Sequence, residues 1–372
     1  MPGLYVHIPF CETKCIYCDF YSVETRDQHA AFLSALHREI DMRAAVLPDD
    51  VVFHSIFFGG GTPSLLTAGE LSDLLDALRS RFRFNTDAEI TVECNPGTVD
   101  EEKLRGYRSA GVNRLSFGVQ SFHADDLQFL SRIHSAEEAE AAIRAAHAAG
   151  IANVNLDLMF SLPGQTPKHW MYNLERARAL GTTHLSCYSL TVEQGTPLAR
   201  MVQRGMVSMP PEESDAALFE QTMETLDGWD FRQYEVSNYA KPGFTCRHNL
   251  TYWRHEDYLG FGPSAHSTWL GRRWWNLSNL GRWLDAVDDG RLPKRAANSS
   301  IPPHSAANTS ICVSAAKAST SQNSPASTAA TSSPTAAASS TPASPTANSS
   351  SPTDASPSHA AALSSATKSA RS

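Results

Sequence analysis

The chain of 372 residues lacks several features that would place it in common classes of protein. It has no excess of positive charge, because 31 Lys and Arg residues face 39 Asp and Glu residues and give a net charge of −8. Nucleic-acid-binding proteins normally carry a basic patch, so we expect no nucleic-acid partner. No apolar run approaches the roughly 20 residues that span a bilayer, so we expect no transmembrane segment. No secretory signal pattern opens the sequence, which predicts a cytoplasmic protein.

Cysteine is scarce, and the positions of the few cysteines are informative. The chain has seven of them, an odd number that favours a reducing compartment over a disulfide framework. Cys11, Cys15 and Cys18 form a C-x3-C-x2-C run. A [4Fe–4S] cluster with full protein ligation uses four cysteines, so three would leave one iron open to a small molecule. The alternative is a zinc site with His7 as its fourth ligand.

The end of the sequence lacks aromatic residues altogether. The last one is Trp283, and Ala, Ser, Thr and Pro dominate residues 296–372. Such a segment cannot bury enough apolar area to offset its conformational entropy. We predict a disordered tail over 296–372, after a folded part with regions at 1–200 and 201–295. The abrupt change also suggests a reading-frame shift or a truncated gene model near 295–298, which resequencing of the gene would test.

What the sequence does contain is a regular alternation of two patterns. Short apolar or β-branched runs occur at Leu4–Ile8, Ser55–Phe58, Glu89–Glu93, Arg114–Val119, Asn153–Met159 and His184–Leu190. Amphipathic stretches lie between them, at Gln28–Ala45, Ala68–Phe82, Glu101–Ala110, Ala136–Ala149 and Lys168–Leu180. Alternating strands and helices predict right-handed crossovers and a parallel sheet. Six such units predict an α/β fold, a partial (β/α)6 barrel, because a closed eight-stranded barrel needs two more.

Unusual residues follow the predicted strands at one end, where α/β barrels carry their chemistry. They are the three cysteines after the first run, Gly59–Pro63 after the second, Glu93–Gly97 after the third, Gly118–Phe122 after the fourth, and Asp157 near the end of the fifth. A charge such as Asp157 in an apolar run is rare unless it is paired or functional. The sequence therefore predicts a binding site at the carboxyl ends of the strands.

The cysteine run followed by Gly59-Gly60-Gly61-Thr62-Pro63 resembles the radical S-adenosylmethionine (SAM) superfamily. This resemblance implies a [4Fe–4S] cluster on Cys11, Cys15 and Cys18, an electron donor for it, and SAM on the open iron. It implies that Glu93 contacts the ribose hydroxyls and that Arg132 pairs with the SAM carboxylate. The full set of implied SAM contacts is Tyr5, Tyr17, Gly60, Gly61, Thr62, Glu93, Gln120, Arg132 and Asp157. Taken singly, most of these residues have an ordinary alternative as turn, surface or core residues.

Two segments, Tyr5–Cys11 and Arg114–Phe122, look like the oxygen-independent coproporphyrinogen oxidase group. Its decarboxylating branch carries a further cysteine where this chain has Phe20, whereas Cys18-Asp19-Phe20 resembles the branch of HemW-type haem chaperones. The segment His248–Trp253 is similar to the H-N-x-x-Y-W pattern of that branch, which implies haem binding at His248. A neutral imidazole is a good axial ligand for haem iron. The physical alternative is a histidine that packs and forms hydrogen bonds among aromatic residues.

The resemblance implies a protein that binds haem and passes it to haem-requiring apoproteins, and it assigns no catalytic residue. Two alternatives stay open. One is an enzyme that decarboxylates the propionates of coproporphyrinogen III to give protoporphyrinogen IX. The other is a truncated, inactive product, since the predicted tail stands where the family continues into a folded C-terminal domain.

Overall fold

A sheet of twelve strands forms the centre of the computed structural model, which describes residues 1–298. The strand order is β12-β11-β10-β9-β1-β2-β3-β4-β5-β6-β8-β7. Its six central strands are parallel neighbours: β1 (Gly3–Ile8), β2 (Val52–Gly60), β3 (Arg83–Cys94), β4 (Arg114–Gln120), β5 (Asn153–Phe160) and β6 (His184–Ser189). Over the described residues the sheet ends at β12 and β7 and does not close. The predicted α/β fold, a partial (β/α)6 barrel, is confirmed. We call the six parallel strands and their helices the half-barrel.

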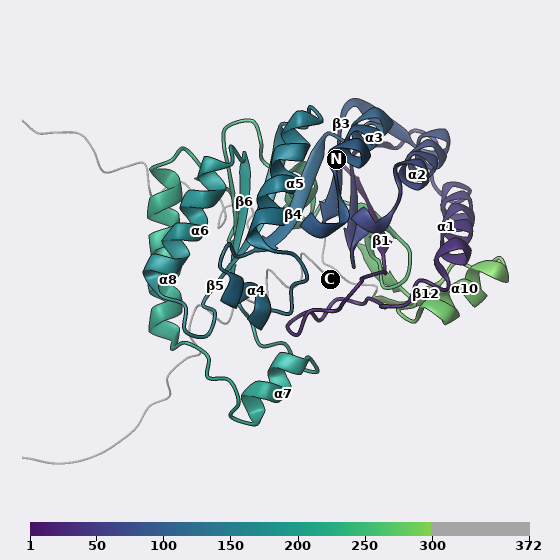
Figure 1. Cartoon of the computed structure of the whole chain (residues 1–372). Coiled ribbons are helices and arrows are strands. Elements are labelled where there is room, and N and C mark those ends of the chain that lie inside the picture. Colours follow the sequence, from purple (N-terminus) through teal and green to yellow (C-terminus); the bar gives the residue numbers. More distant parts are fainter. Residues whose placement is uncertain (299–372) are drawn as a thin grey trace, which may run out of the picture. The chain divides into compact units, whose positions relative to one another are not determined.

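Helices follow the central strands, and most of them cover one face of the sheet, whereas the helix at Pro197–Gln203 extends away from it (Figure 1). They are α1 (His29–Ala44), α2 (Ala68–Arg81), α3 (Glu101–Ala110), α4 (Ala124–Phe129), α5 (Ala136–Ala148), α6 (Pro167–Ala179), α7 (Pro197–Gln203) and α8 (Glu212–Asp227). Side-chain caps explain where several of them begin. Thr67 and Ser135 each form a capping box with a glutamate three residues later. Gly111 ends α3 with a φ of 106°, which only glycine adopts easily.

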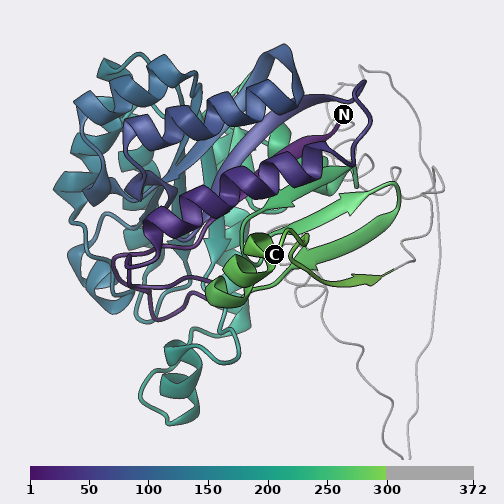
Figure 2. The ribbon, with the colours of Figure 1, turned by 90° about the vertical axis from the view of Figure 1, so that its right-hand side faces the viewer.

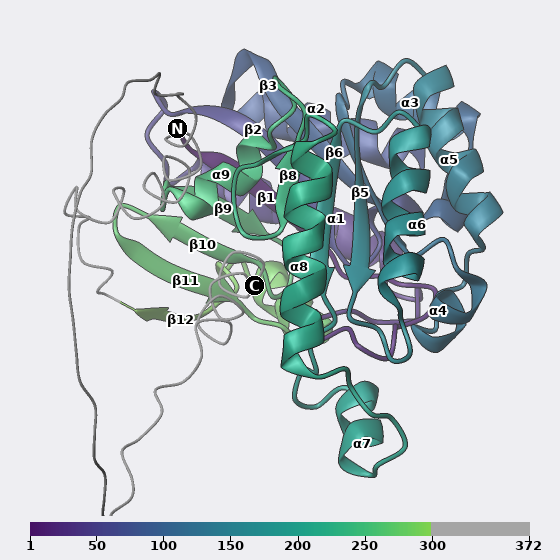
Figure 3. The ribbon, with the colours of Figure 1, turned by 90° about the vertical axis from the view of Figure 1, so that its left-hand side faces the viewer.

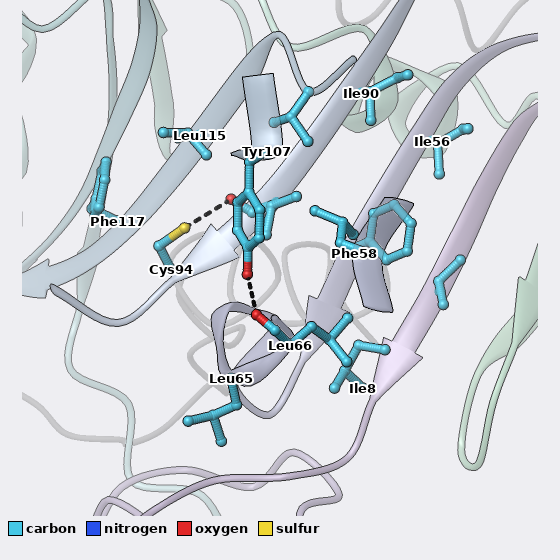
Figure 4. Close-up of a cluster of buried hydrophobic side chains, with 14 of the residues drawn as sticks. Ile8, Ile56, Phe58, Leu65, Leu66, Ile90, Cys94, Tyr107, Leu115 and Phe117 are labelled. Atoms are coloured by element: carbon cyan, nitrogen blue, oxygen red, sulfur yellow. Dashed lines mark hydrogen bonds between the residues drawn. The ribbon is translucent and has the colours of Figure 1, made fainter. Parts of the chain in front are cut away.

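Successive residues of the central strands face two different environments. One set, which includes Ile56, Phe58, Ile90, Leu115 and Phe117, packs under the helices in the main hydrophobic core (Figure 4). Each fully buried Leu or Phe contributes about 1.5–3 kcal/mol. The alternate set is mostly polar and also buried: Ser55, Glu89, Thr91, Arg114, Ser116, Asn155, His184 and Ser186. The inner face of the half-barrel is therefore a polar surface shielded from solvent.

Residues after α8 extend both edges of this one sheet (Figure 3). On one side, β8 (Asn238–Ala240) pairs with β6, and β7 (Arg232–Gln233) pairs with β8. On the other side, β9 (Tyr258–Phe261) runs parallel to β1, followed by antiparallel β10 (His266–Trp269), β11 (Arg272–Asn276) and β12 (Lys294–Asn298). The predicted boundary at 200/201 falls inside α7, and the one at 295/296 falls inside β12. Residues 299–372 of the predicted tail lie outside the described part.

The strands β9–β12 and α10 (Leu280–Asp288) form an extension of the sheet, and α10 lies beside α1 (Figure 2). A buried ion pair on α1 forms hydrogen bonds with this extension. Arg43 Nη2 lies 2.9 Å from Glu39 Oε1 and donates to Asn276 Oδ1 at 2.7 Å. Glu39 also accepts from the backbone N–H of Gly262 at 2.7 Å. The charges are fully hydrogen-bonded, which is the condition under which a buried ion pair is tolerated. None of the helices in the described residues is long and apolar enough to cross a membrane.

Candidate functional site

The cysteine loop leaves the carboxyl end of β1 and is closed at its base by backbone hydrogen bonds. Cys11 N donates to Val23 O at 3.0 Å, and Val23 N donates to Pro9 O at 2.7 Å. The glycine segment after β2 is joined to the same base, since Thr62 N donates to Phe10 O at 2.7 Å. Backbone hydrogen bonds therefore hold the base of the loop against the glycine segment.

The three thiols of this loop are free and half-buried. Thr62 Oγ1 donates to Cys11 Sγ at 3.6 Å, and Arg132 Nη1 donates to Cys15 Sγ at 3.4 Å. Burial raises the pKa of Cys11, an effect that the Thr62 bond opposes, and burial raises the pKa of Cys18 to about 11. Metal ligation requires thiolates, so binding to these cysteines must release protons.

The zinc alternative does not fit the geometry of the described residues. Both ring nitrogens of His7 are engaged, Nε2 with Tyr21 O at 2.9 Å and Nδ1 with Tyr5 Oη at 3.1 Å. No group of three or more His, Cys, Asp or Glu side chains in the described part converges as the ligands of one metal ion. Three thiolates that each bind a different iron of a cluster need not converge in this way. The set of three free thiols in one loop fits an iron–sulfur cluster.

The glycine segment packs against β1 so tightly that side chains are excluded. Gly60 has a φ of 111°, and a Cβ there would lie 2.6 Å from the His7 ring. A Cβ on Gly61 would lie 2.6 Å from the carbonyl oxygen of Phe10. Glycines in this segment also let a ligand approach the backbone closely. The structure gives them a further reason, because the protein itself fills the space where a side chain would stand.

Arg132 links the cysteine loop to the ends of β3 and β4. Its Nη2 donates to Gly118 O at 2.6 Å and to Asn95 Oδ1 at 3.4 Å, while its Nε is buried without a partner. Gln120 lies beside it, with a φ of 70° where the register of β4 shifts. Bulges and strained φ values often re-aim a side chain at a functional site. Tyr188 Oη donates to Gln120 Oε1 at 3.3 Å.

Tyr17 belongs to the same group. It lies in the cysteine loop and packs against the small hydrophobic cluster around Leu130, Met159 and Leu198. Leu198 N donates to Ile16 O at 3.0 Å, so α7 contacts the loop beside this tyrosine. Burial raises the pKa of Tyr17 far above its ordinary value, which the charge of Arg132 opposes. Tyr17 therefore stays uncharged and places an aromatic ring near Arg132.

A second group of predicted residues on the inner face consists of Tyr5, Gly60 and Glu93. Glu93 Oε2 accepts from Gly60 N at 3.2 Å, and a Cβ on Gly59 would lie within 3.1 Å of both Glu93 and Tyr5. Asp157 stands apart on β5, where its Oδ1 accepts from Asn155 Nδ2 at 2.9 Å. All the predicted SAM contacts thus lie on the inner face or on the loops at the carboxyl ends of the parallel strands, which we call the rim. They form separate contact groups.

His248 lies away from the cysteine loop, although its ring stacks on that of Tyr5 at 6.4 Å between centroids. It lies in α9 (Arg247–Trp253) near the start of β1, where a Cβ on Gly3 would be 3.0 Å from its Nδ1. The ring is buried and stacks on Phe57, with Nδ1 bonded to Ser55 Oγ at 2.9 Å and Nε2 to Tyr252 Oη at 2.8 Å. Burial, and then the charges of His54 and Arg114, lower its pKa to about 3. The described conformation is that of a packed, hydrogen-bonded histidine.

Comparison with known proteins agrees with this geometry. A model of the radical SAM superfamily matches residues 5–183. The protein named "Heme chaperone HemW" of Bacillus subtilis is 39% identical over 299 residues, which make up 79% of this chain and 78% of that protein. Its namesake in Escherichia coli is 43% identical over 266 residues, or 71% of this chain and 69% of that protein.

This chain belongs to the HemW family. Membership of the radical SAM superfamily implies a [4Fe–4S] cluster and SAM as cofactors. Among solved structures, coproporphyrinogen III oxidase (HemN) of Escherichia coli, described as a radical SAM enzyme, has a TM-score of 0.70 and 28% identity. That match covers 80% of this chain and 72% of the enzyme. The fold of this chain is thus similar to that of an enzyme named for the alternative function.

Sequence reasoning missed residues that support the rim from behind. Asn95, which accepts from Arg132, has its backbone N–H bonded to Ser64 Oγ at 3.0 Å. Lys103 of α3 donates to Ser64 O at 2.5 Å and to Thr98 O at 3.0 Å, joining the two rim loops. Beneath them Tyr107 Oη donates to Leu66 O at 2.6 Å (Figure 4). The only signal in the sequence was the position of Asn95 directly after a predicted strand.

Proposed function

We propose that this chain is a radical SAM protein that binds haem and delivers it to haem-requiring proteins. The observation that carries the proposal is its 39–43% identity, over more than two thirds of their length, to proteins named as haem chaperones. We further propose the cytoplasm as its location, because the three free thiols of the site persist in a reducing compartment.

In this proposal Cys11, Cys15 and Cys18 hold the cluster, which supplies an open iron for SAM and an electron from a separate donor. Arg132 offers a guanidinium with a free Nε to the SAM carboxylate. The remaining SAM contacts keep their predicted roles: Tyr5, Tyr17, Gly60, Gly61, Thr62, Glu93, Gln120 and Asp157. Support for this assignment comes from the contacts of Thr62 with Cys11 and of Arg132 with Cys15.

His248 is the proposed haem ligand, and its surroundings set a condition. Its low pKa keeps the imidazole neutral, which is the form that binds iron. Nε2 can bind iron only after the Tyr252 hydroxyl, 2.8 Å away, has moved. Haem binding at this residue therefore requires a displacement of α9, or of Tyr252 within it.

The test uses the full chain with its cluster reconstituted without air. Haem is added, uptake is followed by its absorption band, and transfer is measured to apomyoglobin as a general haem acceptor. The proposal predicts stable uptake followed by transfer. In parallel, coproporphyrinogen III and SAM are added with a chemical reductant, and no protoporphyrinogen is expected. Failure to take up haem contradicts the proposal.

The second candidate is the coproporphyrinogen III oxidase reaction. It is favoured by the similarity to HemN at a TM-score of 0.70. Against it stands Phe20, an exposed residue at the position where the resemblance places the oxidase branch's further cysteine. Protoporphyrinogen formation in the parallel assay would establish this candidate and overturn the chaperone.

A further inference from the structure

Three adjacent residues of the inner face each bury a polar atom that has no hydrogen-bond partner. Thr91 of β3 lies directly opposite Arg114 of β4, and Arg114 lies directly opposite Asn153 of β5. The unpartnered atoms are Thr91 Oγ1, Arg114 Nε and Asn153 Oδ1. Roughly 90% or more of buried polar groups in proteins are paired. Three exceptions side by side on neighbouring strands indicate a place where a ligand completes the structure.

Arg114 is the unusual member of this group. Its side chain is only 1% exposed, and over the described residues no carboxylate oxygen lies within 4.0 Å of its guanidinium. Glu89, a nearby acid, is already engaged, because its oxygens accept from Cys246 Sγ at 3.3 Å, Arg247 N at 3.0 Å and His248 N at 3.1 Å. Glu89 and Asp157 stabilise the charge of Arg114 from a distance, but neither forms an ion pair with it. A buried cation without a directly bonded anion is costly, so an incoming anion would be favoured.

The three side chains suit one class of ligand. Arg114 donates through Nε in the fixed geometry that matches a carboxylate. The Thr91 hydroxyl is a second donor. The amide of Asn153 becomes a third when its oxygen and nitrogen are exchanged, an orientation that hydrogen-bond partners decide. Donors from three neighbouring strands therefore lie side by side on the same face of the sheet.

We propose that Thr91, Arg114 and Asn153 form a carboxylate site inside the half-barrel, and that the site takes a propionate of the bound haem. This inference rests on the proposed function. The site lies at the same end of the half-barrel as His248, because the backbone of His248 bonds to Glu89, two residues before Thr91 on β3. In this proposal both residues bind the same haem molecule. His248 binds its iron, and Arg114 binds the carboxylate of one of its propionates.

The test compares haem with its dimethyl ester, in which both propionates are neutral. Each is titrated by absorbance into the reconstituted full chain. Wild type is expected to bind haem at least tenfold more tightly than the ester. Arg114→Gln is expected to lower the affinity for haem about tenfold and to leave ester binding unchanged. The preference for the free acid then disappears.

Further variants guard against a folding defect in Arg114→Gln. Arg114→Lys keeps the charge but loses Nε, and Thr91→Val keeps the shape but loses the hydroxyl; each is expected to reduce the preference several-fold. Arg43→Lys is the matched control, because Arg43 is equally buried but is paired with Glu39 on α1, and it should keep the full preference.

The outcomes separate the two proposals. If wild type binds haem and the ester equally, or if folded Arg114 and Thr91 variants keep the full preference, then the site holds only water and this inference is wrong. The chaperone proposal would survive that result. If wild type binds neither molecule, the chaperone proposal fails, and the carboxylate site falls with it.

Discussion

The two ends of the half-barrel differ in how readily a ligand reaches the residues proposed to bind it. At the carboxyl end, the three thiols are half-buried and free, and Arg132 keeps an unpartnered Nε. At the amino end, α9 covers the inner face and both ring nitrogens of His248 have partners. The length of β1, about 17 Å at 3.3 Å per residue, separates them. The amino end also holds the unpartnered polar atoms of Thr91, Arg114 and Asn153. The rim is thus prepared for its ligands, whereas at the amino end a ligand reaches His248 only after it displaces the Tyr252 hydroxyl.

The largest effect is expected from Cys15→Ala at the rim. Loss of one of three thiolates should abolish cluster assembly, because the remaining two cannot hold a cubane that already lacks a fourth protein ligand. Iron and sulfide analysis after anaerobic reconstitution measures this. Cys187→Ala is the matched control, since Cys187 is buried in the hydrophobic core, and it should retain the cluster. Retention of a full cluster by Cys15→Ala would contradict the assignment.

Arg132→Gln should weaken SAM binding while leaving the cluster in place. A charge-assisted bond to a carboxylate contributes about 1.5–3 kcal/mol, which corresponds to roughly 10- to 150-fold in affinity. Anaerobic calorimetry with SAM is the measurement. Arg105→Gln removes an exposed arginine that pairs with Glu101 and should leave the affinity unchanged. Equal losses in both variants would show a general charge effect and not a rim contact.

The packing of the glycine segment is tested by Gly61→Ala. The added Cβ would meet the Phe10 and Ile8 carbonyl oxygens, so we expect a loss of about 1–3 kcal/mol in the free energy of unfolding. Gly69→Ala is the control, because Gly69 is exposed in α2 and its nearest neighbour would be 4.0 Å away. Denaturant unfolding compares the two. Equal stability of both variants would show that the rim is looser than the structure implies.

Acid should destabilise the protein through histidines that are buried at both ends. Burial lowers the pKa of His134, next to Arg132, and of His248 to about 3 each, and that of His7 to about 4. Below pH 6.5 these histidines bind protons in the unfolded chain but not in the folded chain. Their contribution to the free energy of unfolding is therefore fully present above pH 6.5. It is lost as the pH falls toward 4, by up to about 1.4 kcal/mol per pH unit for each histidine.

His134→Gln isolates one of these contributions. Gln can still donate to Val119 O, as His134 Nε2 does at 3.1 Å, but it does not titrate. The slope of unfolding free energy between pH 6 and 4.5 should become shallower by about one histidine's share. The exposed His147 serves as control through His147→Gln. An unchanged slope in His134→Gln would mean that His134 is protonated in the folded protein.

The smallest effect is expected from Tyr252→Phe, which removes the hydroxyl from His248 Nε2. If haem must displace this bond, its loss should raise haem affinity about fivefold, since a neutral hydrogen bond contributes about 1 kcal/mol. Absorbance titration with haem is the measurement. Tyr258→Phe alters a neighbouring tyrosine whose ring contacts Tyr252, and it should leave the affinity unchanged. A lower affinity in Tyr252→Phe would assign the ligand role to the tyrosine.

The six parallel strands were predictable because each is a short apolar run between helices with clear caps and C-terminal glycines. The gathering of the cysteines and Thr62 followed from the rule that parallel strands end at one edge, whereas Arg132 was implied by the family resemblance. The partners of His248 did not, because Ser55 is 193 residues away in the sequence. The edge strands β7–β12 could not be predicted either. For example, β7 has two residues, which is too short to show the alternation of apolar and polar residues that marks a strand. Tertiary contacts, and not local pattern, decide these parts.

The claim on which the rest depends is that the rim cluster leaves one iron for SAM. The most direct measurement is electron paramagnetic resonance of the reduced, anaerobically reconstituted chain with and without SAM. We predict about four irons and four sulfides per chain and a spectrum that changes when SAM is added. A zinc-containing protein without sulfide, or a cluster spectrum that SAM leaves unchanged, would contradict the account.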